Sequence, residues 1–134
     1  MSAATNYLEL KILDDLVGNT AYTPPATIYV ALATNATTPD VEAGTFTECT
    51  GSAYVRQGIT GTDWATAASG AVSTSTNIEF PTATGDWGVI THVALMEQSS
   101  GGEALVIQQL ASPKTVETGD TFVINSGNLT LSLD

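Results

Sequence analysis

The chain has 134 residues with 3 basic and 14 acidic side chains, which gives a formal net charge of −11, and it contains one cysteine and one histidine. These numbers exclude an intramolecular disulfide, a Cys/His metal site and a basic phosphate-binding surface, so we expect no cofactors and neither nucleic acid nor membrane as a partner. The length fits one domain over residues 1–134, with a helical N-terminal segment over 1–20 and a β-sandwich over 21–134. No apolar run reaches the roughly 18 residues of a membrane span, and the first residues lack the pattern of a signal peptide, so we expect synthesis in a cytoplasm.

The first predicted element is a helix over residues 7–17. Asn6 is the predicted N-cap, Glu9 completes a capping box with it, and Gly18 follows as the residue that ends the helix. Its apolar stripe consists of Leu8, Ile12, Leu13, Leu16 and Val17. We expect this stripe to pack on the sheet of the same chain, with packing on a neighbouring subunit as the alternative.

After Gly18 the apolar period changes from that of a helix to the two-residue period of strands. Strands are predicted over 27–34, 53–59, 78–80, 89–96 and 104–110, with shorter ones at 116, 121–124 and 129–133. The segment 89–96 is apolar on both faces and should be central, and a turn over 99–102 joins it to 104–110 as a hairpin. Turn residues recur every eight to twelve positions, which indicates an antiparallel β-sandwich, jelly-roll-like, with one short N-terminal α-helix.

Two polar segments separate these strands. Residues 35–51 are predicted to form a long loop with at most a short strand around Phe46, and loops of this length often carry function. Residues 60–76 are rich in Ala, Ser, Thr and Gly and are consistent with either weak edge strands or ordered loop.

The residues that could carry chemistry do not form a recognisable set. His92 lies within a predicted strand with no G-x-S-x-G motif in the chain, and it is best interpreted as a partly buried residue bonded to a nearby hydroxyl or carbonyl. The acidic residues show neither the D-x-D-x-D-G calcium loop nor a spacing that marks a catalytic pair. We therefore expect a protein that is not an enzyme.

Three other side chains invite a structural interpretation first. Arg56, the single arginine, is expected to form an ion pair with an acid on a neighbouring strand, with an intersubunit contact as the alternative. Trp87 is expected to close the core at the end of the sandwich, whereas Trp64 fits a core or a contact surface equally well.

Several segments resemble a known family. They are NYLE (6–9), PATIYVAL (25–32), YVRQ (54–57), IEFPTAT (78–84), WGVITH (87–92), PKTV (113–116), GDTF (119–122) and LTLSLD (129–134). Together they resemble small structural proteins of tailed bacteriophages, whose members are often labelled tail fibre proteins. The resemblance covers most of the chain in order and is weakest over 35–51.

The resemblance implies one of two places in the virion. The first is a capsid decoration or cement protein, a homotrimer that binds the major capsid protein on the head exterior and stabilises the shell. The second is a tail or tail-fibre component that contacts the host receptor. A carbohydrate-binding module is a third class, and the two tryptophans are its only support. In each phage placement the protein is made in the host cytoplasm.

The composition favours the cement function, because a sandwich with polar contact faces suffices for it and negative charge keeps it away from packaged DNA. Long fibres usually need sequence repeats, and this chain has none. The loop over 35–51 and the N-terminal segment are the expected contact elements. The candidate interaction residues are Tyr7, Leu8, Asp40, Glu42, Phe46 and Trp64.

Overall fold

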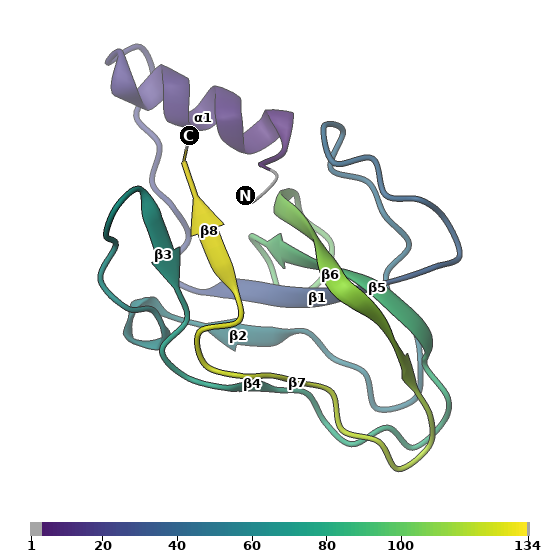
Figure 1. Ribbon diagram of the computed structural model, residues 1–134. Coiled ribbons are helices and arrows are strands. Elements are labelled where there is room, and N and C mark those ends of the chain that lie inside the picture. Colours follow the sequence, from purple (N-terminus) through teal and green to yellow (C-terminus); the bar gives the residue numbers. More distant parts are fainter. Residues whose placement is uncertain (1–3, 134) are drawn as a thin grey trace.

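The computed structural model describes residues 4–133, and its largest element is an antiparallel four-stranded sheet with the strand order β2-β1-β5-β6 (Figure 1). Two further pairs, β3-β8 and β4-β7, are also antiparallel. The elements are α1 (Asn6–Leu16), β1 (Ile28–Thr34), β2 (Gln57–Ile59), a 3-10 helix (Gly61–Asp63), β3 (Ala71–Ser73), β4 (Ile78–Glu79), β5 (Gly88–Met96), β6 (Ala104–Val116), β7 (Val123–Ile124) and β8 (Thr130–Ser132). Residues 1–3 and 134, at the two ends of the predicted domain, lie outside this description.

The mainly β class with antiparallel sheets and one short N-terminal helix is confirmed. The jelly-roll order stays a prediction, because the strands outside the four-stranded sheet pair only two by two. The described part of the chain contains no helix with the length and apolar character that crossing a bilayer requires.

The centre of the sheet is formed by β1 and β5, which confirms the central position predicted for 89–96. Leu32 lies opposite Val93 and Ala31 opposite Ala94, and all four side chains are buried. Both strands bury residues on both faces because aliphatic residues occupy consecutive positions in each. The predicted hairpin of 89–96 with 104–110 is confirmed by the pairing of β5 with β6.

Aromatic rings fill the core between this sheet and the β4-β7 pair. The Phe80 ring stacks on Tyr54 at 6.2 Å and meets Phe122 edge-on at 5.8 Å, and the Trp87 ring meets Tyr54 edge-on at 5.5 Å. Trp87 is 5% exposed and its indole N–H donates to the Ser52 carbonyl at 2.8 Å, which confirms its predicted core position.

Trp64 packs against the same core from a half-buried position. Trp87 is therefore enclosed in the core, whereas Trp64 is only partly covered by it.

Several strands begin or end at other residues than the sequence predicts. The strand predicted over 53–59 is only Gln57–Ile59, because Ala53 has a left-handed φ of 71° and the next residues leave the sheet. Conversely, the strand predicted at 116 is the end of β6, which resumes its pairing with β5 at Lys114 after an irregularity that follows Gln109. Residues 60–76 contain the 3-10 helix and β3, and the predicted loop over 35–51 contains isolated bridges but no strand.

The start of α1 differs from the prediction by one residue. Thr5, not Asn6, is the N-cap: its Oγ1 accepts from the Leu8 N–H at 3.3 Å and donates to the Ala104 carbonyl at 2.7 Å. The Thr5 N–H also donates to the Leu105 carbonyl, so the edge of β6 holds Thr5 in an extended conformation and Asn6 is already helical. The predicted capping box of Asn6 with Glu9 is therefore wrong. The helix ends as predicted, with Gly18 at φ 75°.

Candidate interaction surface

The N-terminus of α1, the long loop and the turn between β5 and β6 meet at one end of the molecule. The Asn6 N–H donates to the Glu42 carbonyl at 3.0 Å, which joins the helix to the loop. The Tyr7 hydroxyl donates to Glu97, the residue after β5, at 3.1 Å. The pKa of the Tyr7 hydroxyl is raised, first by burial and second by the nearby Glu97 carboxylate. The structure thus brings together two segments that the sequence singles out as contact elements.

The six candidate residues do not all share this surface. Glu42 is exposed beside the helix, and the exposed Asp40 accepts from the Ala43 N–H at 3.1 Å, so its carboxylate shapes the tip of the loop. Phe46 is half-buried against a small cluster that includes Met96 and Ile107, and it helps to fix the loop to the sheet. Trp64 lies beside β3 instead, with its backbone bridged to Thr74.

The two faces of α1 are reversed from the expected arrangement. Tyr7, Leu8, Lys11 and Asp14 are half-buried, and no residue of the helix is fully buried. The outward residues are Leu10 (63% exposed), Ile12 (38%), Leu13 (56%), Leu16 (78%) and Val17 (75%). The prediction that the apolar stripe packs on the sheet of the same chain is wrong except for Leu8, which packs against the core. The reason is the anchoring of the helix start through Thr5 and Tyr7, which turns the polar side inward.

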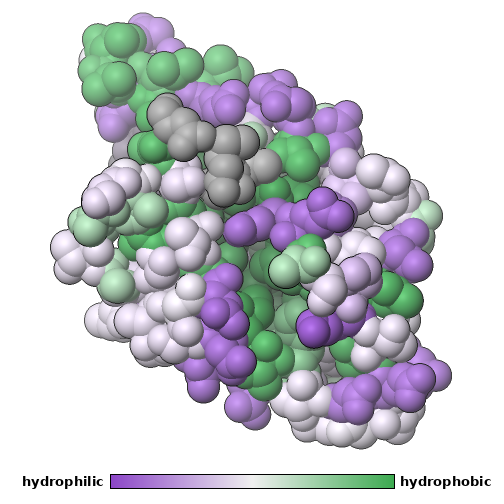
Figure 2. Space-filling model, viewed as in Figure 1, coloured by the Kyte–Doolittle hydropathy of each residue, from purple (hydrophilic) through white to green (hydrophobic). Residues whose placement is uncertain are grey.

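These outward side chains form a visible apolar area. Figure 2 shows hydrophobic residues gathered over α1 at one corner of the molecule, next to hydrophilic residues. We call the five outward residues the apolar face of α1.

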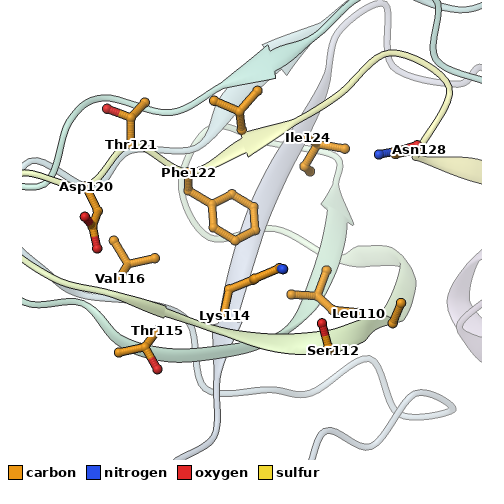
Figure 3. Close-up of a pocket in the computed structure, with 12 residues that line it drawn as sticks. Leu110, Ser112, Lys114, Thr115, Val116, Asp120, Thr121, Phe122, Ile124 and Asn128 are labelled. Atoms are coloured by element: carbon orange, nitrogen blue, oxygen red, sulfur yellow. The ribbon is translucent and has the colours of Figure 1, made fainter.

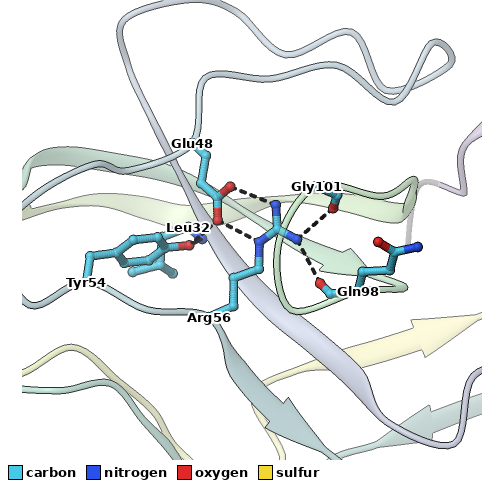
Figure 4. Close-up of polar contacts among 6 residues, drawn as sticks. All are labelled: Leu32, Glu48, Tyr54, Arg56, Gln98 and Gly101. Carbon is cyan, nitrogen blue, oxygen red and sulfur yellow. Dashed lines mark hydrogen bonds and ion pairs between the residues drawn. The ribbon is translucent and has the colours of Figure 1, made fainter.

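The single arginine fixes the other end of the loop to the hairpin turn. Arg56 Nη2 forms an ion pair with Glu48 Oε1 at 2.8 Å, and its Nε donates to Glu48 Oε2 at 2.8 Å (Figure 4). Its Nη1 donates to the carbonyls of Gln98 at 2.7 Å and Gly101 at 2.8 Å, both in the turn between β5 and β6. The ion pair predicted for Arg56 is confirmed, with Glu48 bridged to β1 as the acid. Only the tertiary structure identifies the two carbonyls as further partners.

Tyr54 completes this cluster. Its hydroxyl donates to Glu48 Oε2 at 2.7 Å and accepts from the Leu32 N–H at 3.0 Å. Burial raises the pKa of Glu48, but the hydrogen bonds from Arg56 and Tyr54 and the guanidinium charge outweigh it, so the pKa lies below its ordinary value. The pKa of Tyr54 is strongly raised, first by burial and then by Glu48. The side chains of Glu48, Tyr54 and Arg56 thus bond to one another and to the backbone of the turn, so the cluster holds the loop and the turn in place.

A cleft of about 720 Å³ lies between the second half of β6 and the segment around β7 (Figure 3). The turn after β6 leads directly into this segment, yet β6 pairs with β5 and β7 pairs with β4, so the two consecutive strands diverge. Leu110, Phe122 and Ile124 supply apolar lining, and Lys114 and Asp120 are the charged residues of the wall. The sequence contains no signal for this cleft, because it arises from strands that separate.

The remaining reactive side chains are engaged or buried. His92 Nδ1 lies 2.9 Å from the Thr91 hydroxyl, and burial lowers the His92 pKa, in agreement with the predicted structural role. Burial raises the pKa of the Cys49 thiol, which keeps it protonated. Over residues 4–133, no group of three or more His, Cys, Asp or Glu side chains is arranged to hold a metal ion.

Comparison with known proteins identifies a family. A family model described as podophage GP4 fiber I protein gp80 matches residues 3–132, from the segment before α1 to β8. No curated protein matches the chain.

Proposed function

The chain belongs to the family of podophage GP4 fiber I protein gp80 and is a structural protein of a phage virion, and from this premise we propose that it is a non-enzymatic docking subunit on the virion exterior. The family match over residues 3–132 is the observation that carries the proposal. It agrees with the resemblance drawn from the sequence segments. The clusters described above support it further, because their polar groups serve packing and loop positioning.

The fibre apparatus is the first placement that we propose, because the matched family is described by a fiber protein. The longest strand, β6, has 13 residues, which corresponds to about 43 Å if fully extended. With most other strands much shorter, this fold suits a joint or an end of a fibre and does not suit an extended shaft. The chain would then connect a fibre or the tail to its neighbour, or present a surface to the host receptor.

The head exterior is the second placement, in which the chain is a decoration protein bound to the major capsid protein. The net charge of −11 favours it, because acidic subunits on the shell are not drawn to the packaged DNA. A cement of this kind stabilises the assembled shell by mass action, by about 2.7 kcal/mol per site at a hundredfold excess over Kd. A homotrimer around local threefold axes is part of this placement.

Deletion of the gene from the phage separates the two placements. If the chain is a fibre component, particles without it should keep the heat and osmotic resistance of their heads while adsorption to the host falls. If it is a decoration protein, adsorption should be kept while the heads lose DNA at lower temperature, and adding the purified chain should restore them. Gold-labelled antibody against the chain should mark fibres or tails in the first case and heads in the second. Unlabelled particles with both properties intact would refute a virion docking role.

A second assay tests the non-enzymatic part of the proposal. The purified chain should not hydrolyse peptidoglycan, capsule polysaccharide or esters. Hydrolysis that disappears in His92→Ala or Asp120→Asn would show that the chain is an enzyme.

A further inference from the structure

The amphipathic helix α1 carries its polar side toward its own protein and its apolar side toward solvent. On the inner side, Tyr7 bonds to Glu97, and the Lys11 ammonium lies 5.5 Å from the centre of the Tyr7 ring. Asp14, also inward, accepts from Asn19 with both its backbone carbonyl at 2.9 Å and its carboxylate at 3.4 Å. The Tyr7–Glu97 bond and the packing of Leu8 against the core fix the rotation of the helix about its axis, so the apolar face cannot turn inward without breaking them.

The apolar face is continuous. At 3.6 residues per turn, its five residues span about 160° of the helix circumference. All five are at least 38% exposed, and Leu16 and Val17 are more than 70% exposed. Scattered exposed aliphatic residues are ordinary in soluble proteins, but a complete apolar helix side turned away from the core marks a contact surface.

The area of this face argues against a second copy of the chain as its cover. A stable interface needs about 800 Å² from each partner, which is more than one side of a single 11-residue helix presents. A groove buries more, because its walls also contact the flanks of the helix.

The charge around the helix indicates the rim of that groove. Glu9 lies at the N-terminal end of the apolar face, and Asp15 and Glu42 are exposed beside it. Glu97 and Glu103 lie near the inward Tyr7, where both carboxylates act on its hydroxyl. A second copy would bring the same charges, and each copy carries −11, whereas a basic rim would complement them.

We propose that α1 docks its apolar face into an apolar groove, rimmed by lysine and arginine side chains, on a different protein of the virion. This inference rests on the proposed place of the chain in the virion and names the kind of partner that holds it there. The helix acts as the anchor, and the rest of the fold is left free to face outward.

Phage that carry variants of the full chain test this anchor. In Leu13→Glu/Leu16→Glu, the two new charges would enter the apolar groove, so the copies of the chain per purified particle, counted by mass spectrometry, should fall at least tenfold. Val55→Glu is the matched control, because Val55 is also aliphatic and 52% exposed but lies outside α1, and it should leave the copy number unchanged. Glu9→Lys should lower the copy number, and Glu117→Lys, an exposed turn residue far from the helix in sequence, should not.

Measurements on the purified chains show what kind of molecule covers the apolar face of α1. The helix signal in circular dichroism should be the same in all variants, because every substituted side chain is exposed. Sedimentation velocity should give the same association state for wild type and Leu13→Glu/Leu16→Glu. A wild-type oligomer that this variant dissolves would overturn the inference in favour of a second copy. Flotation with phosphatidylcholine vesicles that the variant abolishes would overturn it in favour of a lipid surface.

Failure of the inference and of the proposed function give different results. If wild-type particles contain the chain and Leu13→Glu/Leu16→Glu particles contain as much, the helix is not the anchor although the virion placement stands. If wild-type particles contain none, the virion placement fails and the inference fails with it.

Discussion

Helix α1 and the strand pair β1-β5 are both rich in aliphatic residues, yet they use them in opposite ways. Val30, Leu32, Val93 and Leu95 are at most 4% exposed, whereas the aliphatic side chains of the apolar face are 38–78% exposed. The strands are held on both edges by hydrogen-bonded neighbours and covered on both faces. The helix is held at its first residues by Thr5 and Tyr7.

The comparison shows that an apolar pattern predicts a face suited to burial, but not whether the rest of the chain covers it. In β1 and β5 the covering residues belong to the same chain. In α1 the contacts of the first turn orient the helix so that its apolar side lies outside the fold. A stability measurement on the isolated chain should therefore respond to the aliphatic residues of the strands and change little when those of the apolar face are substituted.

The largest expected effect is in the strands. Leu32→Ala removes a side chain that is 0% exposed in the central strand β1 and leaves a cavity, so it should lower the free energy of unfolding by about 4 kcal/mol. Chemical denaturation followed by tryptophan fluorescence measures it. A loss under about 1 kcal/mol would mean that β1 is not the packed centre of the fold.

Arg56→Ala should have the next largest effect, about 3 kcal/mol, because it leaves Glu48 unpaired and frees the carbonyls of the β5-β6 turn. Lys114→Ala removes the same charge from an exposed position and is the matched control, with little expected change. Arg56→Lys should recover only part of the loss, because an ammonium cannot reproduce the paired contacts. Equal stability of Arg56→Ala and Lys114→Ala would show that the cluster does not hold the loop.

The same cluster predicts a pH dependence. The Glu48 pKa in the folded chain is below its ordinary value near 4.5, so its contribution to stability is complete above that value and is lost as the pH falls through the lowered folded pKa. Glu48→Gln should be less stable than wild type at neutral pH and should lose less stability on acidification. Unfolding measured from neutral pH to about pH 3 tests this, with the exposed Glu117→Gln expected to keep the wild-type slope.

Thr5→Ala tests the attachment of the helix to the sheet. It removes the N-cap and the bond to Ala104, and the loss should be about 1.5 kcal/mol. Thr5→Ser keeps the hydroxyl and should recover most of it. Hydrogen exchange should show α1 opening more readily in Thr5→Ala, and unchanged protection there would contradict the assigned cap.

The smallest expected effect sharpens the comparison most. Leu16→Ala removes as much side chain as Leu32→Ala, but Leu16 is 78% exposed, so the unfolding free energy should change by less than about 0.5 kcal/mol. A loss as large as that of Leu32→Ala would mean that the apolar face is covered within the purified protein.

Several features could be predicted from local sequence because local chemistry decides them. The helix ends at Gly18 because glycine readily adopts the left-handed conformation. The segment 89–96 is central because apolar residues occupy its consecutive positions, and it forms a hairpin with 104–110 because a short turn joins the two. The one-residue error at the helix start has a different origin. Thr5 and Asn6 are both good caps, and the bonds of Thr5 to the edge of β6, about 100 positions away, decide between them.

The candidate site could be predicted only in part. The sequence predicts the N-terminal segment and the loop as separate contact elements, and only the structure joins them, through the bond from Asn6 to Glu42. Phe46 and Trp64 are predicted contact residues, but both pack against apolar clusters of the same chain. The sequence cannot distinguish the two positions, because an aromatic residue in a polar segment can face either the core or solvent. No local sequence pattern predicts the cleft between β6 and β7, because the cleft forms where β6 pairs with β5 and β7 pairs with β4.

By itself, the sequence determined the antiparallel β class and the existence of the helix, because residue periodicity and turn residues act over short distances. It also determined that Arg56 pairs with an acid, because a single arginine among many acidic residues has few alternatives. Only the tertiary structure decided which way the helix faces, which carbonyls share the arginine and where the strands separate. Each of these depends on contacts between residues far apart in the chain, and the contacts of Thr5 with β6 and of Tyr7 with Glu97 leave the apolar side of α1 exposed.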